Sequence, residues 1–184
     1  MTQEIARSRP SSSIVCLVGI SVWLGGLATR PAFAAAVSSS CSANSASRQL
    51  DYWLGDWTVS YPGGPGSSAS KVYLSLDQCL LIESWDGGKG HKGENLFAYS
   101  DDDKSWHGMF ADNQGRVHVF EGNMANGAGE FTGPSRGSNG EKVLNRIKIV
   151  RVNANKVEQS WEKSLDNGAT WATEFHGEYT RKNP

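Results

Sequence analysis

The chain has 184 residues, of which 38% are hydrophobic and 20% are charged, and its formal net charge is -1. This length suits one domain with a substantial core better than two domains. The nearly balanced charge argues against nucleic acid or an anionic membrane surface as a partner.

Residues 1–34 have the features of an export signal. Arg7 and Arg9 precede an apolar run over residues 14–28, and small residues near position 34 offer a cleavage site. The run is short and interrupted by glycines, which favours a cleaved signal over a retained membrane anchor. We therefore expect a periplasmic or secreted protein with no stable anchor. Residues 35–48 would form a flexible arm, and residues 49–184 would form one folded domain.

Removal of this signal changes the cysteine count and the charge. Cys16 leaves with the signal, so the exported chain keeps Cys41 and Cys79. Without the signal's three arginines and one glutamate, 15 basic and 18 acidic side chains remain, a net charge of -3. An even pair of cysteines in an exported protein predicts a disulfide, which would pin the polar arm to a strand. The alternative is a buried free Cys79 with an exposed Cys41.

Beyond the arm, the sequence predicts short strands and turns. Residues 48–54 favour one or two helical turns that end at Gly55. Alternating apolar and polar residues between Gly-, Asn- and Asp-rich turns then predict ten strands, over residues 57–61, 71–76, 80–85, 95–100, 105–111, 117–122, 129–133, 143–152, 157–164 and 170–181. With no long helix for crossovers, we expect an all-β antiparallel up-and-down barrel, with a two-sheet sandwich as the alternative.

The faces of two strand regions can be assigned from their alternation. On residues 171–179, odd-numbered positions from Trp171 to Tyr179 are expected to share one face. A tight turn at residues 113–114 would place Trp106, Gly108 and Phe110 on the same face as Val117 and Val119. The opposite face of that hairpin would hold His107, Met109, His118 and Phe120.

Residues 164–171 fit the pattern S-x-D-x-G-x-T-W, known as an Asp box. In this motif the Asp166 carboxylate is expected to accept backbone N–H groups of a tight turn, and Gly168 supplies a positive φ. The motif is a folding device and does not indicate catalysis. It occurs once here, without a repeat of about 40 to 50 residues, which argues against a propeller.

Five stretches carry a resemblance to a known family, namely residues 50–57, 79–85, 145–147, 157–171 and 175–179. They resemble an exported bacterial family of unknown function, within the lipocalin-like or fatty-acid-binding-protein-like barrels of the calycin group. The stretches span about 130 residues, so the resemblance implies the barrel fold for nearly the whole domain. Gly108 and Ile149 stand where Gln and Trp are usual, which should alter the lining of any pocket.

Binding of a small molecule is the function that the sequence favours. Trp85, Trp106 and Trp161 lie mid-strand, where they must face either a packed core or a cavity. Polar residues on the same strands would supply hydrogen bonds within an aromatic pocket, and the candidates are Glu83, Arg146 and Gln159. Alternatively, Arg146 and Glu83 would form a structural ion pair. We expect a monomer without cofactor that binds an apolar or amphipathic molecule.

Two other classes of function remain open at this point. Glu83 and Glu162 each lie beside a tryptophan, so they are the candidates for a hydrolase that acts on glycans with paired carboxylates. A barrel filled with side chains would instead indicate an interaction module. His107 and His118 share one predicted face, but no third ligand accompanies them, so we predict no metal site.

Overall fold

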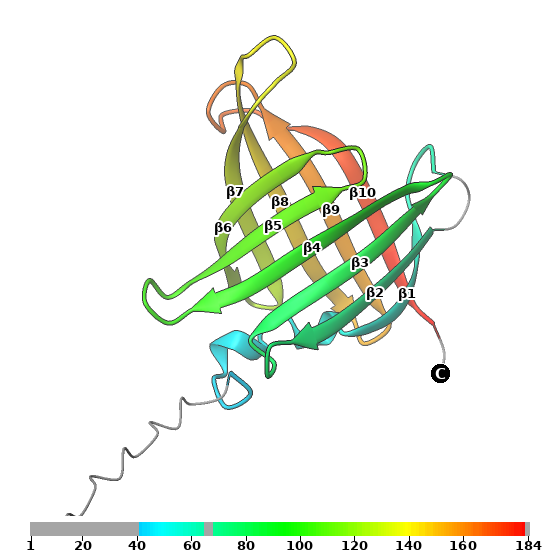
Figure 1. Cartoon of the computed structure of the whole chain (residues 1–184), viewed down its shortest axis with the longest axis vertical. Coiled ribbons are helices and arrows are strands. Elements are labelled where there is room, and N and C mark those ends of the chain that lie inside the picture. Colours follow the sequence, from blue (N-terminus) through cyan, green and yellow to red (C-terminus); the bar gives the residue numbers. More distant parts are fainter. Residues whose placement is uncertain (1–40, 65–67, 183–184) are drawn as a thin grey trace, which may run out of the picture. The chain divides into compact units, whose positions relative to one another are not determined.

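The computed structural model describes residues 41–64 and 68–182, so the predicted export signal lies outside the described residues. The chain forms a closed barrel of ten antiparallel strands (Figure 1). Their bounds are β1 Gly55–Ser60, β2 Ser68–Ser75, β3 Leu80–Gly88, β4 His91–Ser100, β5 Ser105–Asp112, β6 Val117–Ala125, β7 Ala128–Arg136, β8 Lys142–Asn153, β9 Lys156–Ser164 and β10 Ala172–Arg181. None of the helical segments in the described ranges has the length and apolar character needed to cross a membrane.

The strands follow one another around the barrel in chain order, and β1 closes the sheet by pairing with β10. At this closure Val59 lies opposite Tyr179, and Trp57 lies opposite Arg181. Closure leaves no sheet edge exposed to pairing with another chain. The prediction of an up-and-down barrel is therefore confirmed, and the sandwich alternative is wrong.

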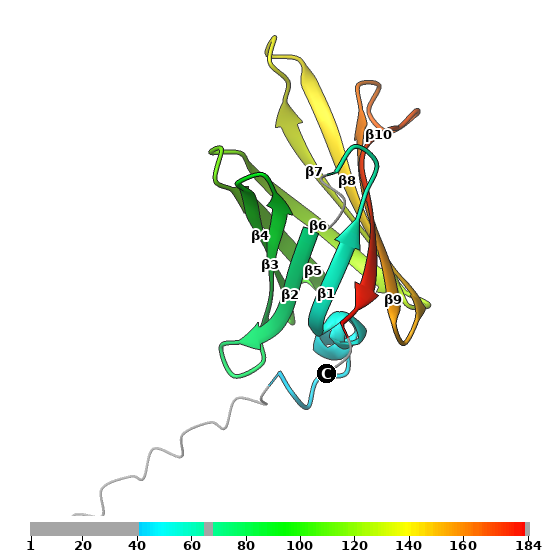
Figure 2. The ribbon, with the colours of Figure 1, turned by 90° about the vertical axis from the view of Figure 1, so that its right-hand side faces the viewer.

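Two 3-10 turns cover one end of the barrel, η1 (Ala46–Arg48) and η2 (Asp51–Trp53), as the sequence predicted (Figure 2). Trp53 is fully buried there, and its carbonyl accepts a hydrogen bond from Trp57 Nε1 at 2.8 Å. Arg181 at the end of β10 donates to the carbonyl of Leu54 at 2.6 Å, and its guanidinium lies over the Trp57 ring. These contacts hold the two 3-10 turns and the end of β10 together at one end of the barrel. This structure, residues 46–54 with Arg181, is here called the plug.

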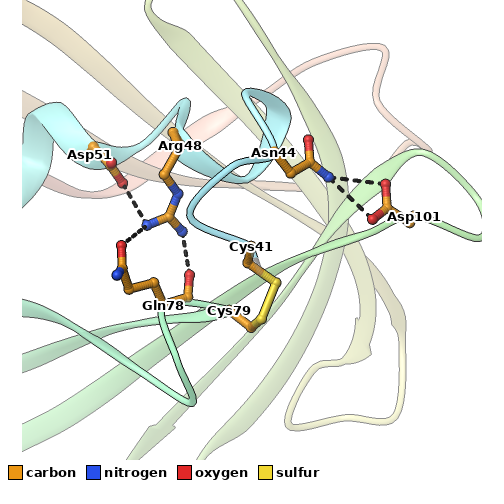
Figure 3. Close-up of a disulfide and its surroundings, with 7 residues drawn as sticks. All are labelled: Cys41, Asn44, Arg48, Asp51, Gln78, Cys79 and Asp101. Atoms are coloured by element: carbon orange, nitrogen blue, oxygen red, sulfur yellow. Dashed lines mark hydrogen bonds and ion pairs between the residues drawn. A yellow bond between two sulfur atoms is a disulfide. The ribbon is translucent and has the colours of Figure 1, made fainter. Parts of the chain in front are cut away.

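A disulfide between Cys41 and Cys79 ties the segment before the plug to the loop between β2 and β3 (Figure 3). Polar contacts reinforce this junction. Arg48 donates to the carbonyl of Gln78, and Asn44 Nδ2 donates to the Asp101 carboxylate at 3.0 Å. The predicted disulfide is thus present at the closed end of the barrel.

The predicted register of the β5–β6 hairpin is wrong by one residue. Phe110 lies opposite His118, because five residues (112–116) separate the paired Ala111 and Val117 in place of the expected two-residue turn. The Asp112 carboxylate shapes this loop by accepting the backbone N–H of Arg116 at 2.9 Å. Phe110, His118 and Phe120 therefore share the inner face, whereas Val117 and Val119 are exposed.

A bulge in β10 corrects the other face assignment. The register with β9 shifts between Thr173 and Phe175, so Thr173 pairs with outward-facing Glu162 while Phe175 pairs with Trp161. Trp171 consequently lies on the outer surface, where the Arg146 guanidinium lies 3.9 Å from its ring centre. A one-residue shift of this kind moves every side chain before the bulge to the opposite face of the sheet, and alternation alone does not reveal it.

Candidate functional site

The interior of the barrel has two halves of different character. Near the plug, large apolar side chains pack against one another without exposure, among them Trp53, Trp57, Phe97, Trp106, Phe131, Ile149 and Val157. Trp106 is fixed in this half by a hydrogen bond from Nε1 to Gln49 Oε1 at 3.2 Å. This half is a filled core of the kind that small barrels normally contain.

The other half holds a cavity of about 280 Å³. It lies towards the end of the barrel that carries the loops β1–β2, β3–β4, β5–β6 and β9–β10, because Tyr61, His91, Arg116 and Lys163 line it from those ends of the strands. Glu83, Asn95, Ile147 and Gln159, which lie nearer the middle of their strands, line its floor.

Two groups of aromatic rings form the walls. On one side Trp85 and Phe175 pack edge to face at 5.9 Å, with Tyr61 5.3 Å from Phe175. On the other side Trp161 packs edge to face against Phe110 at 5.2 Å and against the His118 ring at 4.7 Å. Such arrangements are the preferred geometry of aromatic pairs, so the walls are held in place without a ligand.

Glycines on neighbouring positions make room for these rings. A Cβ on Gly93 would come within 2.6 Å of the Phe110 ring, and one on Gly177 within 2.7 Å of the Phe175 ring. Any larger residue at either position would force the ring to move. The two glycines therefore help to set the position of the cavity walls.

A polar cluster forms the floor. Glu83 is fully buried, and its two carboxyl oxygens accept hydrogen bonds from Ser70 Oγ and Asn95 Nδ2, both at 2.8 Å. Beside them the buried Tyr179 hydroxyl donates to Gln159 Oε1 at 2.9 Å. This cluster, here called the polar floor (Ser70, Glu83, Asn95, Gln159 and Tyr179), brings together residues of β2, β3, β4, β9 and β10.

Burial raises the pKa of the Glu83 carboxyl above its usual range, although hydrogen bonds from the surrounding side chains favour the ionised form. In the described part of the chain no Lys, Arg or His forms an ion pair with it. A buried carboxyl without a cationic partner favours its neutral form. Burial and the nearby Glu83 also raise the pKa of the Tyr179 hydroxyl.

The charged residues around the mouth are paired. Arg116 Nε donates to the buried Asp112 carboxylate at 2.7 Å, and Lys163 Nζ lies 3.0 Å from Glu174 Oε2. Burial opposes ionisation of Asp112, but the bonds from Arg116, His91 and the backbone hold the pKa of its carboxyl well below the usual range. The mouth therefore offers no uncompensated charge from these two pairs.

Four buried polar atoms of cavity-lining residues have no hydrogen-bond partner among the described residues. They are Asn95 Oδ1, Gln159 Nε2, Trp85 Nε1 and His118 Nδ1. A buried polar atom without a partner costs about 1–3 kcal/mol of stability. Native proteins contain few such atoms, so four around one cavity make this region a candidate for binding polar groups.

Four of the six candidate residues predicted from the sequence lie together in this cavity, namely Glu83, Trp85, Gln159 and Trp161. Trp106 does not line it, because its position on β5 places it in the filled half beside Tyr99 and Gln49. Gly108 and Ile149, whose identities depart from the resembled family, also lie below the polar floor against the filled core.

The placement of Arg146 inside the barrel is wrong. On β8 the inward positions are Asn145 and Ile147, so alternation directs Arg146 to the outer surface. There its Nε donates to Glu162 at 2.7 Å, and burial, which opposes ionisation, is outweighed by Arg146 and Lys148, so the pKa of Glu162 falls. Glu83 and Glu162 thus lie on opposite faces of the barrel wall. The two carboxyl groups therefore cannot act as a pair in hydrolysis. Arg146, on the outer face, also does not form the alternative ion pair with Glu83.

The two histidines that alternation predicts on one face of the β5–β6 hairpin lie on opposite faces. His107 lies on the outer face, where its Nε2 is 2.8 Å from Asp103, whereas His118 faces the cavity. Burial and neighbouring cations lower the pKa of His118. Within residues 41–64 and 68–182, no group of three or more His, Cys, Asp or Glu side chains is arranged to hold a metal ion.

Several lining residues escaped the sequence reasoning, chiefly Tyr61, Asn95, Phe110 and Phe175. The alternation places Phe110 and Phe175 each on a face shared with other aromatic residues, but it does not distinguish a cavity wall from a packed core. The signal that was available is glycine within a strand, at positions 93 and 177, which marks a close approach by a large neighbour.

The Asp box forms the turn between β9 and β10, next to the cavity mouth. Asp166 Oδ1 accepts the backbone N–H of Thr170 at 2.8 Å, and Oδ2 accepts its hydroxyl at 2.6 Å. These bonds lower the pKa of Asp166 to about 2. Lys163 and Glu174, which pair at the mouth, flank this turn, so the motif fixes the spacing of one side of the rim.

Comparison with known proteins gives no identity for the chain. No protein-family model matches the sequence, and no curated protein matches it. Its class is therefore defined by the fold, a closed ten-stranded antiparallel barrel with a disulfide at its plugged end.

Proposed function

We propose that this protein is an exported carrier or sensor that binds a small apolar or amphipathic molecule inside its barrel. The single observation that carries the proposal is the aromatic cavity of about 280 Å³ above the polar floor. Ligand sites are typically concave and mostly apolar with a few convergent polar groups, and they often occupy the mouths of β-barrels. This cavity has each of those properties.

The barrel class supports the same function. A closed up-and-down barrel of this size has an interior large enough for side chains or for one small ligand, and here it holds both in separate halves. Membership of the calycin group, suggested by the sequence resemblance, would make an internal ligand site the expected arrangement. Export is supported by the disulfide, since such bonds persist in oxidising compartments.

Titration with N-phenyl-1-naphthylamine, an uncharged apolar fluorophore that accepts energy from tryptophan, tests this function. We expect saturable binding with quenching of tryptophan emission, because Trp85 and Trp161 border the cavity. Trp161→Ala should weaken binding. Trp171→Ala is the matched control, because it removes a tryptophan from the outer surface of the same hairpin.

Trp161 also donates to Asn145 Oδ1 at 3.1 Å, so its loss leaves a buried amide oxygen without that donor. Phe110→Leu avoids this complication, since the phenyl ring has no polar atom and still forms part of the wall. Circular dichroism would verify that each variant is folded. A wild-type protein with no saturable uptake of the fluorophore would refute the proposed function.

A further inference from the structure

We infer that the preferred ligand is an uncharged, planar, fused two-ring heteroaromatic compound that carries a hydrogen-bond donor and an acceptor on one edge, as in a cyclic amide. This inference rests on the proposed function, and it names the chemistry that the same cavity selects. Size, wall composition, polar atoms and charge each contribute one part of it.

Size sets the number of rings. A cavity of about 150 Å³ holds one benzene ring. The cavity in this barrel has about 280 Å³, close to twice that volume. Two fused rings therefore match this volume, and a further group, such as the phenyl ring of N-phenyl-1-naphthylamine, would extend towards the mouth.

The walls select a flat aromatic compound. The group of Trp85 and Phe175 adjoins the group of Phe110 and Trp161, since Phe175 pairs with Trp161, and both groups present rings to the same cavity. Aromatic rings gain energy from offset or edge-to-face contact with other rings beyond the burial of their area. A planar ring system can gain these contacts with several of the rings, and a bulky aliphatic one does not.

The free polar atoms select a donor and an acceptor together. Asn95 Nδ2 is already occupied by Glu83, which leaves Asn95 Oδ1 as a free acceptor. Gln159 Oε1 accepts from Tyr179, and Gln159 Nε2, which lies near the Glu83 carboxyl, has no partner within hydrogen-bond distance among the described residues. A cyclic amide that reached both atoms would offer an N–H to the first and a C=O to the second, and each of these atoms would gain one partner.

Charge selects a neutral compound. The cations at the mouth are engaged with Asp112 and Glu174, so an anionic ligand would have to break an existing pair. At the floor, both Glu83 carboxyl oxygens already accept hydrogen bonds from Ser70 and Asn95, so a cationic group would have to displace one of these donors. A charged ligand would therefore lose hydration without gaining a free counter-ion.

Calorimetric titration with four two-ring probes of similar size tests the inference: naphthalene, 2-quinolone, 2-naphthoate and 2-naphthylmethylammonium. We expect 2-quinolone to bind at least about tenfold more tightly than naphthalene, the gain from one or two neutral hydrogen bonds. The anionic and cationic probes should bind more weakly than naphthalene.

Two variants locate the selectivity. Asn95→Leu and Gln159→Leu should each reduce the preference for 2-quinolone over naphthalene to about threefold or less, the loss of one bond of the pair. Asn123→Leu, on the outer face of β6, is the control and should leave the preference unchanged. Because the result is a ratio between two probes, a general loss of stability does not imitate it.

The outcomes separate this inference from the proposed function. Equal binding of 2-quinolone and naphthalene overturns the inference and leaves a purely apolar site. Tightest binding of the ammonium probe also overturns it, since Glu83 would then act as an ionised counter-charge. If none of the four probes binds, both the inference and the proposed function are refuted.

Discussion

The two halves of the barrel interior are built by the same ten strands with the same alternation, yet one is filled and the other is hollow. In the plugged half, Trp53 and its neighbours pack against one another as a buried core, although Trp53 Nε1 is a buried donor without a partner among the described residues. In the hollow half, aromatic rings surround the cavity, and four buried polar atoms of its lining lack such partners. Features that lower stability in this way usually indicate function, so the contrast locates the site before any ligand is known.

The largest effect on stability is expected at the plug. Trp53→Ala removes a fully buried indole and should lower the free energy of unfolding by about 3–5 kcal/mol. Trp161→Ala should cost less, because Trp161 already borders a cavity. Urea unfolding of both variants measures the difference. Equal losses would mean that the two halves of the interior are packed alike.

The next-largest loss of stability is expected when the disulfide is removed. Replacement of Cys41 and Cys79 by Ser opens a loop with a sequence separation of 38 residues. Chain-entropy arguments give a destabilisation of about 3–4 kcal/mol. Binding of N-phenyl-1-naphthylamine by the folded fraction should be unchanged, since the bond lies at the plugged end. A variant that keeps its stability but loses the fluorophore would contradict this division.

Glu83 gives the polar floor a pH dependence. Because its pKa is raised in the folded state, its contribution to stability is complete below the unfolded pKa of about 4.3 and is lost as pH rises through the folded pKa. The wild type should therefore lose stability relative to Glu83→Gln between about pH 5 and about pH 8. Urea midpoints at the two pH values measure this loss. A constant difference between the two proteins would show that Glu83 is ionised throughout.

The smallest effect is expected at the Asp box. Asp166→Ala removes the acceptor of the Thr170 N–H and hydroxyl and should lower the thermal midpoint modestly. The aromatic walls remain, so binding of N-phenyl-1-naphthylamine should persist. Thermal unfolding and the same fluorescence titration measure both quantities. Unchanged stability with lost binding would instead make Asp166 part of the ligand site.

Much of the fold could be predicted because it depends on local signals. Alternation identified all ten strands, turn residues separated them, and the short apolar segment before Gly55 indicated the 3-10 turns. The even pair of cysteines indicated the disulfide. Each of these signals lies within a few residues of the element that it specifies.

The errors in the candidate site depend on single-residue shifts that local signals do not contain. The five residues between the paired Ala111 and Val117 shift the register of one hairpin by one residue, and the bulge near Thr173 places Trp171 outside. Arg146 was grouped with Glu83 and Gln159 as a polar residue of the pocket, although the adjacent Asn145 and Ile147 are the buried positions. Whether an inward tryptophan meets a core or a cavity depends on what lies across the barrel, as Trp106 and Trp161 show.

Native mass spectrometry of the protein purified from its own host tests most directly whether the hollow half is a binding site. We expect a bound small molecule that dissociates on collisional activation, with reduced occupancy in Phe110→Leu and full occupancy in Trp171→Ala. A wild-type chain that is always free of ligand and also takes up no N-phenyl-1-naphthylamine would contradict the account, because the cavity would then be only a packing defect.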